Sequence, residues 1–492
     1  MFEVPMFIGG KEHLSSSGDW FDSDDPFVGK PWARVTRGNS ADVDLAVESA
    51  SGALAAPEWG GLTATERGAL LVRLADAIVR EADRLAELEV RDNGKLYAEM
   101  FGQVSYLPQW LRYFGGLADK IEGRVIPIDK RGYFAYTRRE PVGVTAIITP
   151  WNSPLMLLMW KLAPALAAGC PVIVKPSEFT SASTVELARV LHRAGLPTGV
   201  FNVVTGFGAE VGAPLVEHEA VAKVSFTGSD TTGRAIGAAA GRGLKHVALE
   251  LGGKSPNIVF EDADLDAAVN GVVSGIFAAT GQTCIAGSRL LVQDSVHDEV
   301  VRRVVELAGA ARMGDPRLAE TQVGPITTRQ QYLKVLDYLT IAKDEGCDVA
   351  LGGGPATTPE VGSGWFIEPT ILTGVRNDMR IAQEEVFGPV LATIPFRDEE
   401  EAVAIANDCA YGLGAGVWTT DTARAFRMAE RIRSGTVWVN TYRAVSFMTP
   451  FGGFKDSGLG RENGAEAIDD YLETKTVWIN TGAEVGNPFV LR

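Results

Sequence analysis

From residue 141 onward, short apolar runs rich in β-branched residues alternate with longer amphipathic runs. Four of the short runs predict strands: VGVTAIITPWN, PVIVK, VFNVVTG and VAKVSFTG. The run TSASTVELARVLHRAGLP predicts a helix, because it opens with Ser and Thr and ends near Gly195 and Pro197. Strands that alternate with helices form a parallel sheet that is covered on both faces. The sequence therefore predicts an α/β fold.

A second alternating series begins at about residue 252. It opens with the helix-like run DADLDAAVNGVVSGIFAAT, which leads directly into GQTC, so we expect two α/β domains. Earlier in the chain, residues 63–95 place apolar side chains at spacings of three and four and end at Gly94, which predicts one long amphipathic helix. Residues 128–141 alternate aromatic and charged side chains, like an exposed β arm that pairs with TVWINT at 476–481. Unpaired strand edges of this kind favour oligomerisation.

Charge and composition exclude several classes of function. The 492 residues carry a net charge of −16, which argues against binding to nucleic acid or to an anionic membrane surface. The start, MFEVPMFIGGKEH, lacks the basic segment of a secretory signal, and the apolar stretch 162–174 contains two prolines and is too short to span a bilayer. The four cysteines form no CxxC pair and suggest no metal-ligand cluster. We expect a cytoplasmic protein with reduced thiols and no metal site.

Cys284 lies in GQTCIAGSR, among glycine, alanine and small polar residues. A thiolate there can act as a nucleophile, and the backbone N–H of Cys284 can help to bind an oxyanion. Gly281 and Gly287 allow close approach of other backbone segments. The alternative is an inert packing cysteine.

Two further residues can take part in the same chemistry. Glu250 ends an apolar strand before a Gly-Gly turn, where burial raises a carboxyl pKa toward that of a useful general base, although a buried ion-pair partner is the alternative. Asn152, in TPWNSP, is held by two prolines and a tryptophan. A fixed Asn amide is a good oxyanion donor, although a plain turn residue is the alternative.

Seven motifs, in order, resemble the conserved series of the aldehyde dehydrogenase superfamily: TPWNSP, KPSE, FTGS, LELGGKSP, GQTC, EEVFGPV and PFGGFKDSGLGRENG. The resemblance extends over nearly the whole chain. It implies two Rossmann-like parallel-sheet domains and a small β oligomerisation arm. The implied bounds are 1–120 and 142–251 for an NAD-binding domain, 252–455 for a catalytic domain, and 121–141 with 470–492 for the arm.

The resemblance also implies a reaction, the oxidation of an aldehyde to a carboxylic acid with a nicotinamide cofactor. In that scheme Cys284 attacks the carbonyl carbon, Asn152 and the Cys284 N–H hold the oxyanion, and Glu250 activates the water that hydrolyses the thioester. Relatives that transfer the acyl group to coenzyme A typically lack the carboxylate at this position, so Glu250 favours a free acid over a coenzyme A-acylating semialdehyde dehydrogenase. A non-catalytic structural relative is the other alternative, and loss of Cys284 or Glu250 would have marked it.

The cofactor residues are carried over from the same resemblance. TGFGAEVG is one residue longer than GxGxxG, so it is not a standard pyrophosphate loop. The implied binding residues are Trp151, Lys175, Ser177, Glu178, Gly208, Gly212, Gly228, Ser229, Glu385 and Phe387. Glu178 is expected to accept hydrogen bonds from the adenosine ribose, which favours NAD. NADP is possible if Glu178 turns outward and Ser177 and Lys175 hold the 2′-phosphate.

The substrate walls follow from the family's tunnel and are mostly apolar. They are Trp151, Met156, Leu157, Trp160, Thr283, Ile285, Val445 and Phe451. Arg443 is the one cation placed near the mouth, where it either attracts an aldehyde with a remote carboxylate or lies on the surface without contacting substrate. We expect a homo-oligomer, a dimer or a tetramer.

Overall fold

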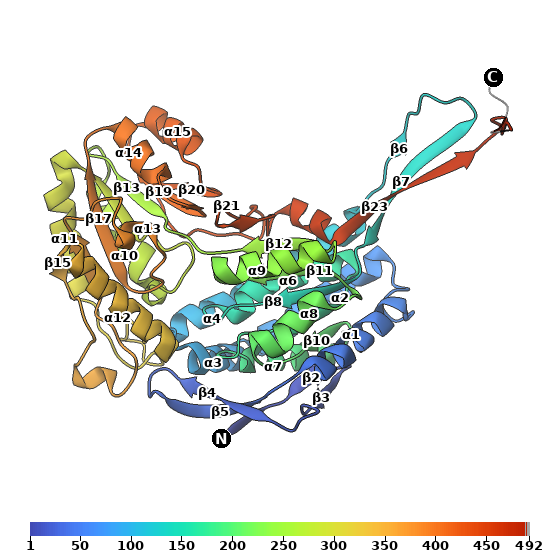
Figure 1. Ribbon diagram of the computed structural model, residues 1–492, viewed down its shortest axis with the longest axis horizontal. Coiled ribbons are helices and arrows are strands. Elements are labelled where there is room, and N and C mark those ends of the chain that lie inside the picture. Colours follow the sequence, from blue (N-terminus) through green and yellow to red (C-terminus); the bar gives the residue numbers. More distant parts are fainter. Residues whose placement is uncertain (488, 490–492) are drawn as a thin grey trace.

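The structure is a computed structural model that describes residues 1–487 and 489. Two large sheets with helices around them form the body, and a thin β arm projects from it (Figure 1). The first sheet runs in the order β22-β12-β11-β8-β9-β10-β2-β3. Its parallel strands are β8 (Val144–Ile148), β9 (Val172–Lys175), β10 (Phe201–Val203), β11 (Val221–Thr227) and β12 (His246–Glu250). Antiparallel strands extend it at both edges: β22 (Gly458–Leu459), β2 (Met6–Ile8) and β3 (Lys11–His13).

The second sheet runs in the order β15-β16-β17-β14-β13-β19-β20 and is parallel except at β15. Its strands are β13 (Pro256–Val259), β14 (Arg289–Gln293), β15 (Asp348–Leu351), β16 (Thr370–Thr373), β17 (Val390–Phe396), β19 (Gly414–Trp418) and β20 (Thr436–Val439). The expected α/β fold with two largely parallel sheets is confirmed. The strands predicted at 142–152, 171–175, 200–206 and 221–228 are all present, although the first ends at Ile148.

Helices cover both sheets. Around the first sheet lie α1 (Ser40–Ala55), α2 (Ala64–Arg80), α3 (Ala82–Asn93), α4 (Tyr97–Tyr106), α5 (Pro108–Leu117), α6 (Pro154–Ala168), α7 (Ala182–Arg193), α8 (Ala213–Glu217) and α9 (Asp230–Arg242). The second sheet has α10 (Leu265–Phe277), α11 (His297–Gly309), α12 (Arg329–Asp344), α13 (Arg380–Gln383), α14 (Glu399–Asn407) and α15 (Thr422–Arg431). Small sheets are formed by β1 (Phe2–Val4), β4 (Trp20–Asp25) and β5 (Lys30–Thr36), and by β18 (Tyr411–Gly412) and β21 (Phe454–Lys455).

The single helix predicted for residues 63–95 is wrong. Two helices, α2 and α3, occupy this stretch, because Glu81 leaves the helical conformation with φ −111° and ψ 11°. The apolar spacing continues across the break, so periodicity alone does not reveal it. Thr63 and Glu66 form a capping box at the start of α2, and Gly94 ends α3 with φ 71°.

Helix α6 is buried along its whole length. A helix that is apolar all round is typical of a core position. Pro154 is its first residue, so the helix starts directly after Asn152 and Ser153. Among the described residues, no helix has the length and apolar content needed to cross a bilayer.

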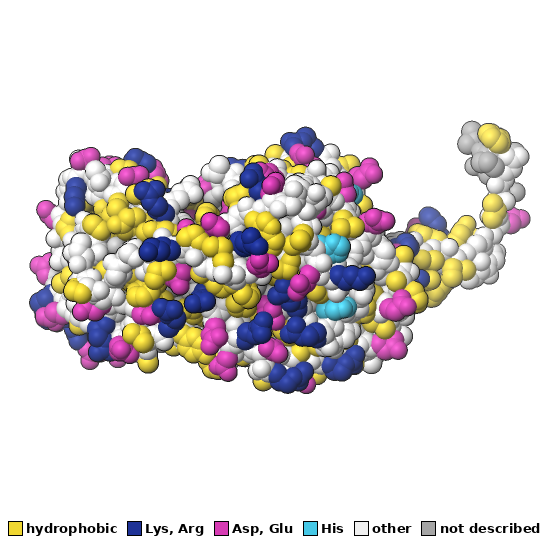
Figure 2. Space-filling model, turned by 90° about the horizontal axis from the view of Figure 1, so that it is seen from below, with side chains coloured by type: hydrophobic (Ala, Val, Ile, Leu, Met, Phe, Trp, Pro, Cys, Tyr) yellow, Lys and Arg dark blue, Asp and Glu magenta, His cyan; other side chains and the backbone are white. Residues whose placement is uncertain are grey.

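The arm is a three-stranded antiparallel sheet of β6 (Val125–Ile126), β7 (Tyr133–Pro141) and β23 (Leu472–Asn480). Thr476 pairs with Thr137 and Asn480 with Tyr133, so the pairing predicted between the two segments is present. The arm extends well beyond the body and carries hydrophobic side chains (Figure 2). Trp478 of β23 is half-exposed. Residues 488 and 490–492, which the sequence assigned to the arm, lie outside the described residues.

The ends of the strands determine where a site can form. Register pairs Ile148 with Lys175 and Thr227 with Glu250, so β8, β9, β11 and β12 end at one edge of the first sheet. In the second sheet, β13, β14 and β17 begin at one edge. Ligands of open α/β sheets bind at the carboxyl ends of the strands. All three predicted catalytic residues lie where these two edges meet.

Candidate active site

Asn152 follows β8 and lies in the turn that leads into α6. The side chain is buried, and Nδ2 donates a hydrogen bond of 3.0 Å to the carbonyl oxygen of Gln282. Gln282 lies two residues before Cys284, so this bond joins the two segments that carry the predicted oxyanion donor and the predicted nucleophile. The side chain is therefore more than a turn residue.

Cys284 follows α10 and the short helical turn η3 (Ala278–Gly281). Ala279 and Thr280 both have φ 54°, a left-handed conformation that is costly for residues other than glycine. At Gly281, an added Cβ would lie 2.1 Å from the carbonyl oxygen of Gly388, so only glycine fits. The segment is held in place by the Gln282 side chain, which accepts from the N–H of Thr327 and donates to the carbonyl of Pro325.

The Cys284 thiol differs from the other three cysteines. Cys170, Cys347 and Cys409 are buried, whereas Cys284 is half-buried and lines a cavity. Burial, with the nearby carboxylates of Glu385 and Glu250, raises the pKa of the thiol to about 12. A nucleophilic thiolate therefore requires a base that removes the proton.

Glu250 ends β12 with both carboxylate oxygens buried and without a hydrogen-bond partner. Burial is the main cause that raises the pKa of Glu250 well above its ordinary value, and the Glu462 carboxylate raises it further. Lys161 and Arg461 act in the opposite direction. Because its oxygens are unpaired, Glu250 has the environment of a general base rather than of an ion-pair partner.

The ion pair of this region is formed by Lys161 and Glu462, which sequence reasoning missed. Lys161 lies in the middle of α6 and is completely buried; its ammonium contacts the Glu462 carboxylate and donates to Thr227 Oγ1 at 2.6 Å. The available signal was a single charged residue in the otherwise apolar run PLMLLMWKLAPALAA. Its partner is 301 residues away, which no local pattern reveals.

A cavity of about 140 Å³ lies next to Cys284. It brings together the predicted residues Trp151, Asn152, Leu157, Gly228, Ser229, Cys284, Glu385 and Phe387. Its other lining residues were not predicted: Pro150, Thr227, Leu251, Gly252, Gln331 and Lys334. Leu157, predicted as a substrate wall, also lines this cavity. Side chains from both sheets thus enclose one space beside the thiol.

The Glu385 carboxylate lines this cavity and is fixed by a backbone hydrogen bond. Its Oε1 accepts a 2.9 Å hydrogen bond from the N–H of Gly253, and burial raises the pKa of its carboxyl to about 7. An added Cβ at Gly252 would lie 2.5 Å from Glu385 Oε2. Phe387, with φ 59°, packs edge-on against Trp151 at a ring-centroid distance of 5.2 Å. A flat ring and a polyhydroxylated group fit such a lining.

The predicted adenosine residues lie along the same sheet edge. Lys175 ends β9, and its Nζ is 2.9 Å from Glu178 Oε2. Ser229 is the N-cap of α9, where its hydroxyl accepts from the N–H of Thr232 at 3.3 Å. The donors at the start of this 13-residue helix suit a phosphate.

Five predicted cofactor residues do not line the cavity described above: Lys175, Glu178, Ser177, Gly208 and Gly212. Ser177 is buried two residues beyond the end of β9. Gly208 and Gly212 are the first and last residues of a helical turn after β10, and an added Cβ at either position would meet no atom within 4 Å. Open space around both glycines is compatible with a ligand that approaches the backbone.

The predicted substrate walls other than Trp151 and Leu157 do not line the cavity that contains Cys284. Thr283 and Ile285 flank it in the chain, and Met156 and Trp160 are buried on α6. The rings of Trp160 and Phe451 are 4.9 Å apart. Val445 and Phe451 line a separate cavity of about 450 Å³. Arg443 is half-buried, and its Nη1 donates to the carbonyl of Ser274 at 3.1 Å.

Known proteins resemble this chain over nearly its whole length. The sequence model of the aldehyde dehydrogenase family matches residues 13–477. The (Z)-2-((N-methylformamido)methylene)-5-hydroxybutyrolactone dehydrogenase of Acinetobacter baylyi is 44% identical over 495 residues, with both chains fully covered. Betaine aldehyde dehydrogenase from Staphylococcus aureus in complex with NAD+ superposes with a TM-score of 0.97 at 37% identity, covering 99% of this chain and 97% of that one. An NAD+ complex of aldehyde dehydrogenase from Bacillus cereus gives 0.95 at 42% identity, covering 98% and 97%.

Proposed function

The chain belongs to the aldehyde dehydrogenase family and is an oxidoreductase that acts on aldehydes, and we propose that it produces the free carboxylic acid through a thioester on Cys284, with NAD as cofactor. The observation that carries the proposal is the hydrogen bond between Asn152 and Gln282, which places an amide donor beside the cysteine segment. The third group that the reaction needs is a base, and the buried Glu250 carboxylate has no hydrogen-bond partner.

The first step needs a thiolate and a place for negative charge. Glu250 takes the thiol proton, because its raised pKa makes it a competent base and its charge influences the Cys284 thiol. The sulfur then attacks the carbonyl carbon, and its C–S bond forms as the carbonyl π pair moves to oxygen. Asn152 Nδ2 and the N–H of Cys284 stabilise that oxyanion. When bound, NAD supplies the acceptor for the hydride that leaves this carbon.

The second step releases the acid. Once Glu250 has released the thiol proton to solvent, its carboxylate removes a proton from water. The hydroxide adds to the thioester carbon, and the C–S bond breaks to return the Cys284 thiolate. The Lys161–Glu462 ion pair adjusts the basicity of Glu250, because Glu462 raises the pKa of Glu250 and Lys161 lowers it. A buried base of this kind supports hydrolysis rather than acyl transfer to coenzyme A.

The cofactor would be held by residues of both sheets. Gly228, Ser229 and the start of α9 suit the pyrophosphate, Glu385 suits the nicotinamide ribose, and Phe387 and Trp151 suit the ring. Lys334 and Gln331 line the same cavity and are added to this set. Glu178 would accept from the adenosine ribose, so we expect NAD to be preferred over NADP. The corresponding units are a cofactor-binding domain (1–120 and 142–251), a catalytic domain (252–455) and the arm (121–141 with 470–492).

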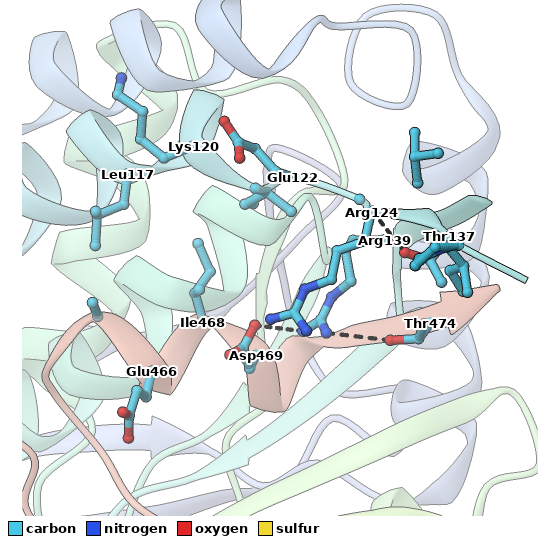
Figure 3. A pocket seen from close by; sticks show the side chains of 16 residues that line it. Leu117, Lys120, Glu122, Arg124, Thr137, Arg139, Glu466, Ile468, Asp469 and Thr474 are labelled. Carbon is cyan, nitrogen blue, oxygen red and sulfur yellow. Dashed lines mark hydrogen bonds and ion pairs between the residues drawn. The ribbon is translucent and has the colours of Figure 1, made fainter. Parts of the chain in front are cut away.

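The same chain is expected to assemble as a homo-oligomer through its arm. Apolar side chains of β23 and β7 lie exposed, and a groove of about 910 Å³ opens at the base of the arm (Figure 3). In it, Arg139 contacts Asp469 and donates to Thr474 Oγ1 at 3.2 Å.

Light scattering of wild type and of Trp478→Glu tests assembly through the arm. The Trp478 variant should form a smaller species, whereas Leu318→Glu, which changes an exposed leucine outside the arm, should not. A monomeric wild type would contradict it.

Mass spectrometry combined with absorbance of reduced nicotinamide tests the reaction. Cys284→Ala should abolish aldehyde oxidation while cofactor binding persists. Glu250→Gln should accumulate an acyl adduct on the protein, because hydrolysis is slowed. Rapid turnover by the Glu250 variant without an adduct would show that another group activates water.

All four cysteines are free thiols, which supports a reducing compartment, the cytoplasm.

A further inference from the structure

The corner between α3 and α4, residues 93–99, is linked by hydrogen bonds to the segment that carries Cys284. The carbonyl oxygen of Asn93, the last residue of α3, accepts a 2.6 Å hydrogen bond from Thr327 Oγ1. The N–H of Thr327 in turn donates to Gln282 Oε1 at 2.9 Å. Because Gln282 precedes Cys284 by only two residues, the corner reaches the nucleophile segment through a single intervening residue.

Lys95 links the same corner to the segment of the proposed oxyanion donor. Its side chain is 3% exposed, and Nζ donates a 3.0 Å hydrogen bond to Ser153 Oγ, in the residue that follows Asn152. This bond is buried, so water does not readily replace either partner, and its loss would be costly. The corner is therefore held in a fixed position relative to Asn152.

Glu99, in the first turn of α4, contacts the cysteine segment directly. Its Oε1 accepts a 2.9 Å hydrogen bond from the N–H of Ala279, five residues before Cys284. Helix α4 is anchored by Met100 and Val104, which are both completely buried, so the carboxylate has a rigid support. Ala279 is itself only 4% exposed, and without Glu99 its N–H would lose its acceptor in a place that water reaches poorly.

Ala279 begins a left-handed turn that is unfavourable in itself. Ala279, Thr280 and Gly281 have φ 54°, 54° and 68°. This conformation suits glycine, but it is costly for alanine and more so for the β-branched threonine, so the turn persists only where its surroundings hold it. Thr280 Oγ1 donates to the carbonyl of Gly324 at 3.1 Å, and Glu99 holds the N–H of Ala279. Loss of the Glu99 bond would therefore release the first residue of the turn.

We propose that Glu99 is a positioning residue for Cys284, because its carboxylate fixes the left-handed turn from which the Cys284 sulfur and N–H are directed at the substrate carbonyl. This inference rests on the proposed function, in which Asn152 and the N–H of Cys284 share the oxyanion. Asn152 donates to the carbonyl of Gln282 on the same segment, so a shift of the turn would separate the two oxyanion donors. The role depends on the length and the acceptor oxygen of the Glu99 side chain, and not on its charge.

Three substitutions separate the reach of this side chain from its charge. Glu99→Gln keeps the length and an acceptor oxygen but removes the charge, Glu99→Asp keeps the charge but is one methylene shorter, and Glu99→Ala removes both. Acylation of Cys284 should stay within about threefold of wild type in Glu99→Gln and should be at least about tenfold slower in Glu99→Asp and Glu99→Ala. Glu87→Ala, which removes an exposed carboxylate from α3, is the matched control and should leave acylation unchanged.

The burst of phenol from an activated aryl ester measures acylation, because it reports attack of the Cys284 sulfur on a carbonyl carbon. Iodoacetamide gives the comparison, since alkylation of the same sulfur forms no oxyanion. Glu99→Ala should slow ester acylation at least about tenfold, but it should change alkylation of Cys284, followed by peptide mass spectrometry, less than about threefold. The dissociation constant for NAD should also stay within about threefold, whereas a general loss of structure would change all three quantities.

The outcomes separate this inference from the proposed function. Wild-type acylation in Glu99→Asp, or a tenfold loss in Glu99→Gln, would overturn the positioning role while leaving aldehyde oxidation through Cys284 intact. Equal losses of acylation and alkylation in Glu99→Ala would overturn it as well. A Cys284→Ala variant that still oxidises butanal would overturn the proposed function and this inference together.

Discussion

Glu462→Gln is expected to move the acidic limb of the thioester-hydrolysis rate to lower pH. Glu250 has a raised pKa, so its base form is present above that pKa and is lost as the pH falls through it. The Glu462 carboxylate contributes to the rise and Lys161 opposes it. Replacing the carboxylate by an amide removes the repulsion and leaves the Lys161 charge uncompensated, and both changes lower the pKa of Glu250.

The expected shift in the pKa of Glu250 depends on how deeply the Glu250 and Glu462 carboxylates are buried. Glu250 and Glu462 are each 4% exposed, so water screens their interaction only weakly. Two unit charges ~8 Å apart at an effective dielectric of ~20 interact by about 2 kcal/mol, and about 1.4 kcal/mol corresponds to one pKa unit. The limb should therefore move down by about 1–1.5 pH units. Glu466→Gln removes the same charge from an exposed position four residues later and should leave the profile unchanged.

An activated aryl ester isolates this step, because it acylates a cysteine thiol without hydride transfer. The steady rate after the initial burst of phenol reports hydrolysis of the acyl-enzyme and can be followed from pH 5 to pH 10. A limb that stays in place in Glu462→Gln, or moves to higher pH, would refute the view that Glu250 is the titrating base and that Glu462 controls it.

Three further outcomes are expected. Asn152→Ala should lower kcat by about 10²–10³, as loss of one oxyanion donor does, and an unchanged kcat would mean that the oxyanion lies elsewhere. Glu178→Thr should reduce the ratio of kcat/KM for NAD to that for NADP by about tenfold, because a like charge near the 2′-phosphate is removed; an unchanged ratio would show that Glu178 does not face the ribose. Arg289→Met should lower the free energy of unfolding by about 3–5 kcal/mol in urea titrations, since the buried guanidinium donates to three backbone carbonyls and to Asn377; a loss below about 1 kcal/mol would contradict this account.

Local patterns predicted the elements of the fold well, because strand and helix periods are local properties. The strands before Asn152, Lys175 and Ser229 lie where the sequence placed them, and their shared edge follows from parallel pairing. The helix predicted at 63–95 failed at Glu81, where the direction of the chain changes although the apolar spacing continues. The β2 and β3 strands at the start of the chain were also missed, because they are only three residues long.

The chemistry of the site was only partly visible in the sequence. Motif resemblance pointed to the thiol, the amide and the carboxylate, but not to Glu462 and Lys161, which act on the pKa of Glu250. Lys161 and Glu462 meet only after the chain has folded, and the contacts of Lys95 with Ser153 and of Glu99 with Ala279 also join distant segments.

Strand β22 pairs with β12 antiparallel, Gly458 against Glu250, so a segment about 200 residues later completes the strand that carries the proposed base. At ~5–20 residues per second, a ribosome needs about 10–40 s to make that segment after Glu250 has been synthesised. During this interval the growing polypeptide holds an open strand edge and a base that lacks its Glu462 neighbour. The site of the nascent enzyme is therefore completed only near the end of translation. A chaperone that shields the β12 edge would act during this interval.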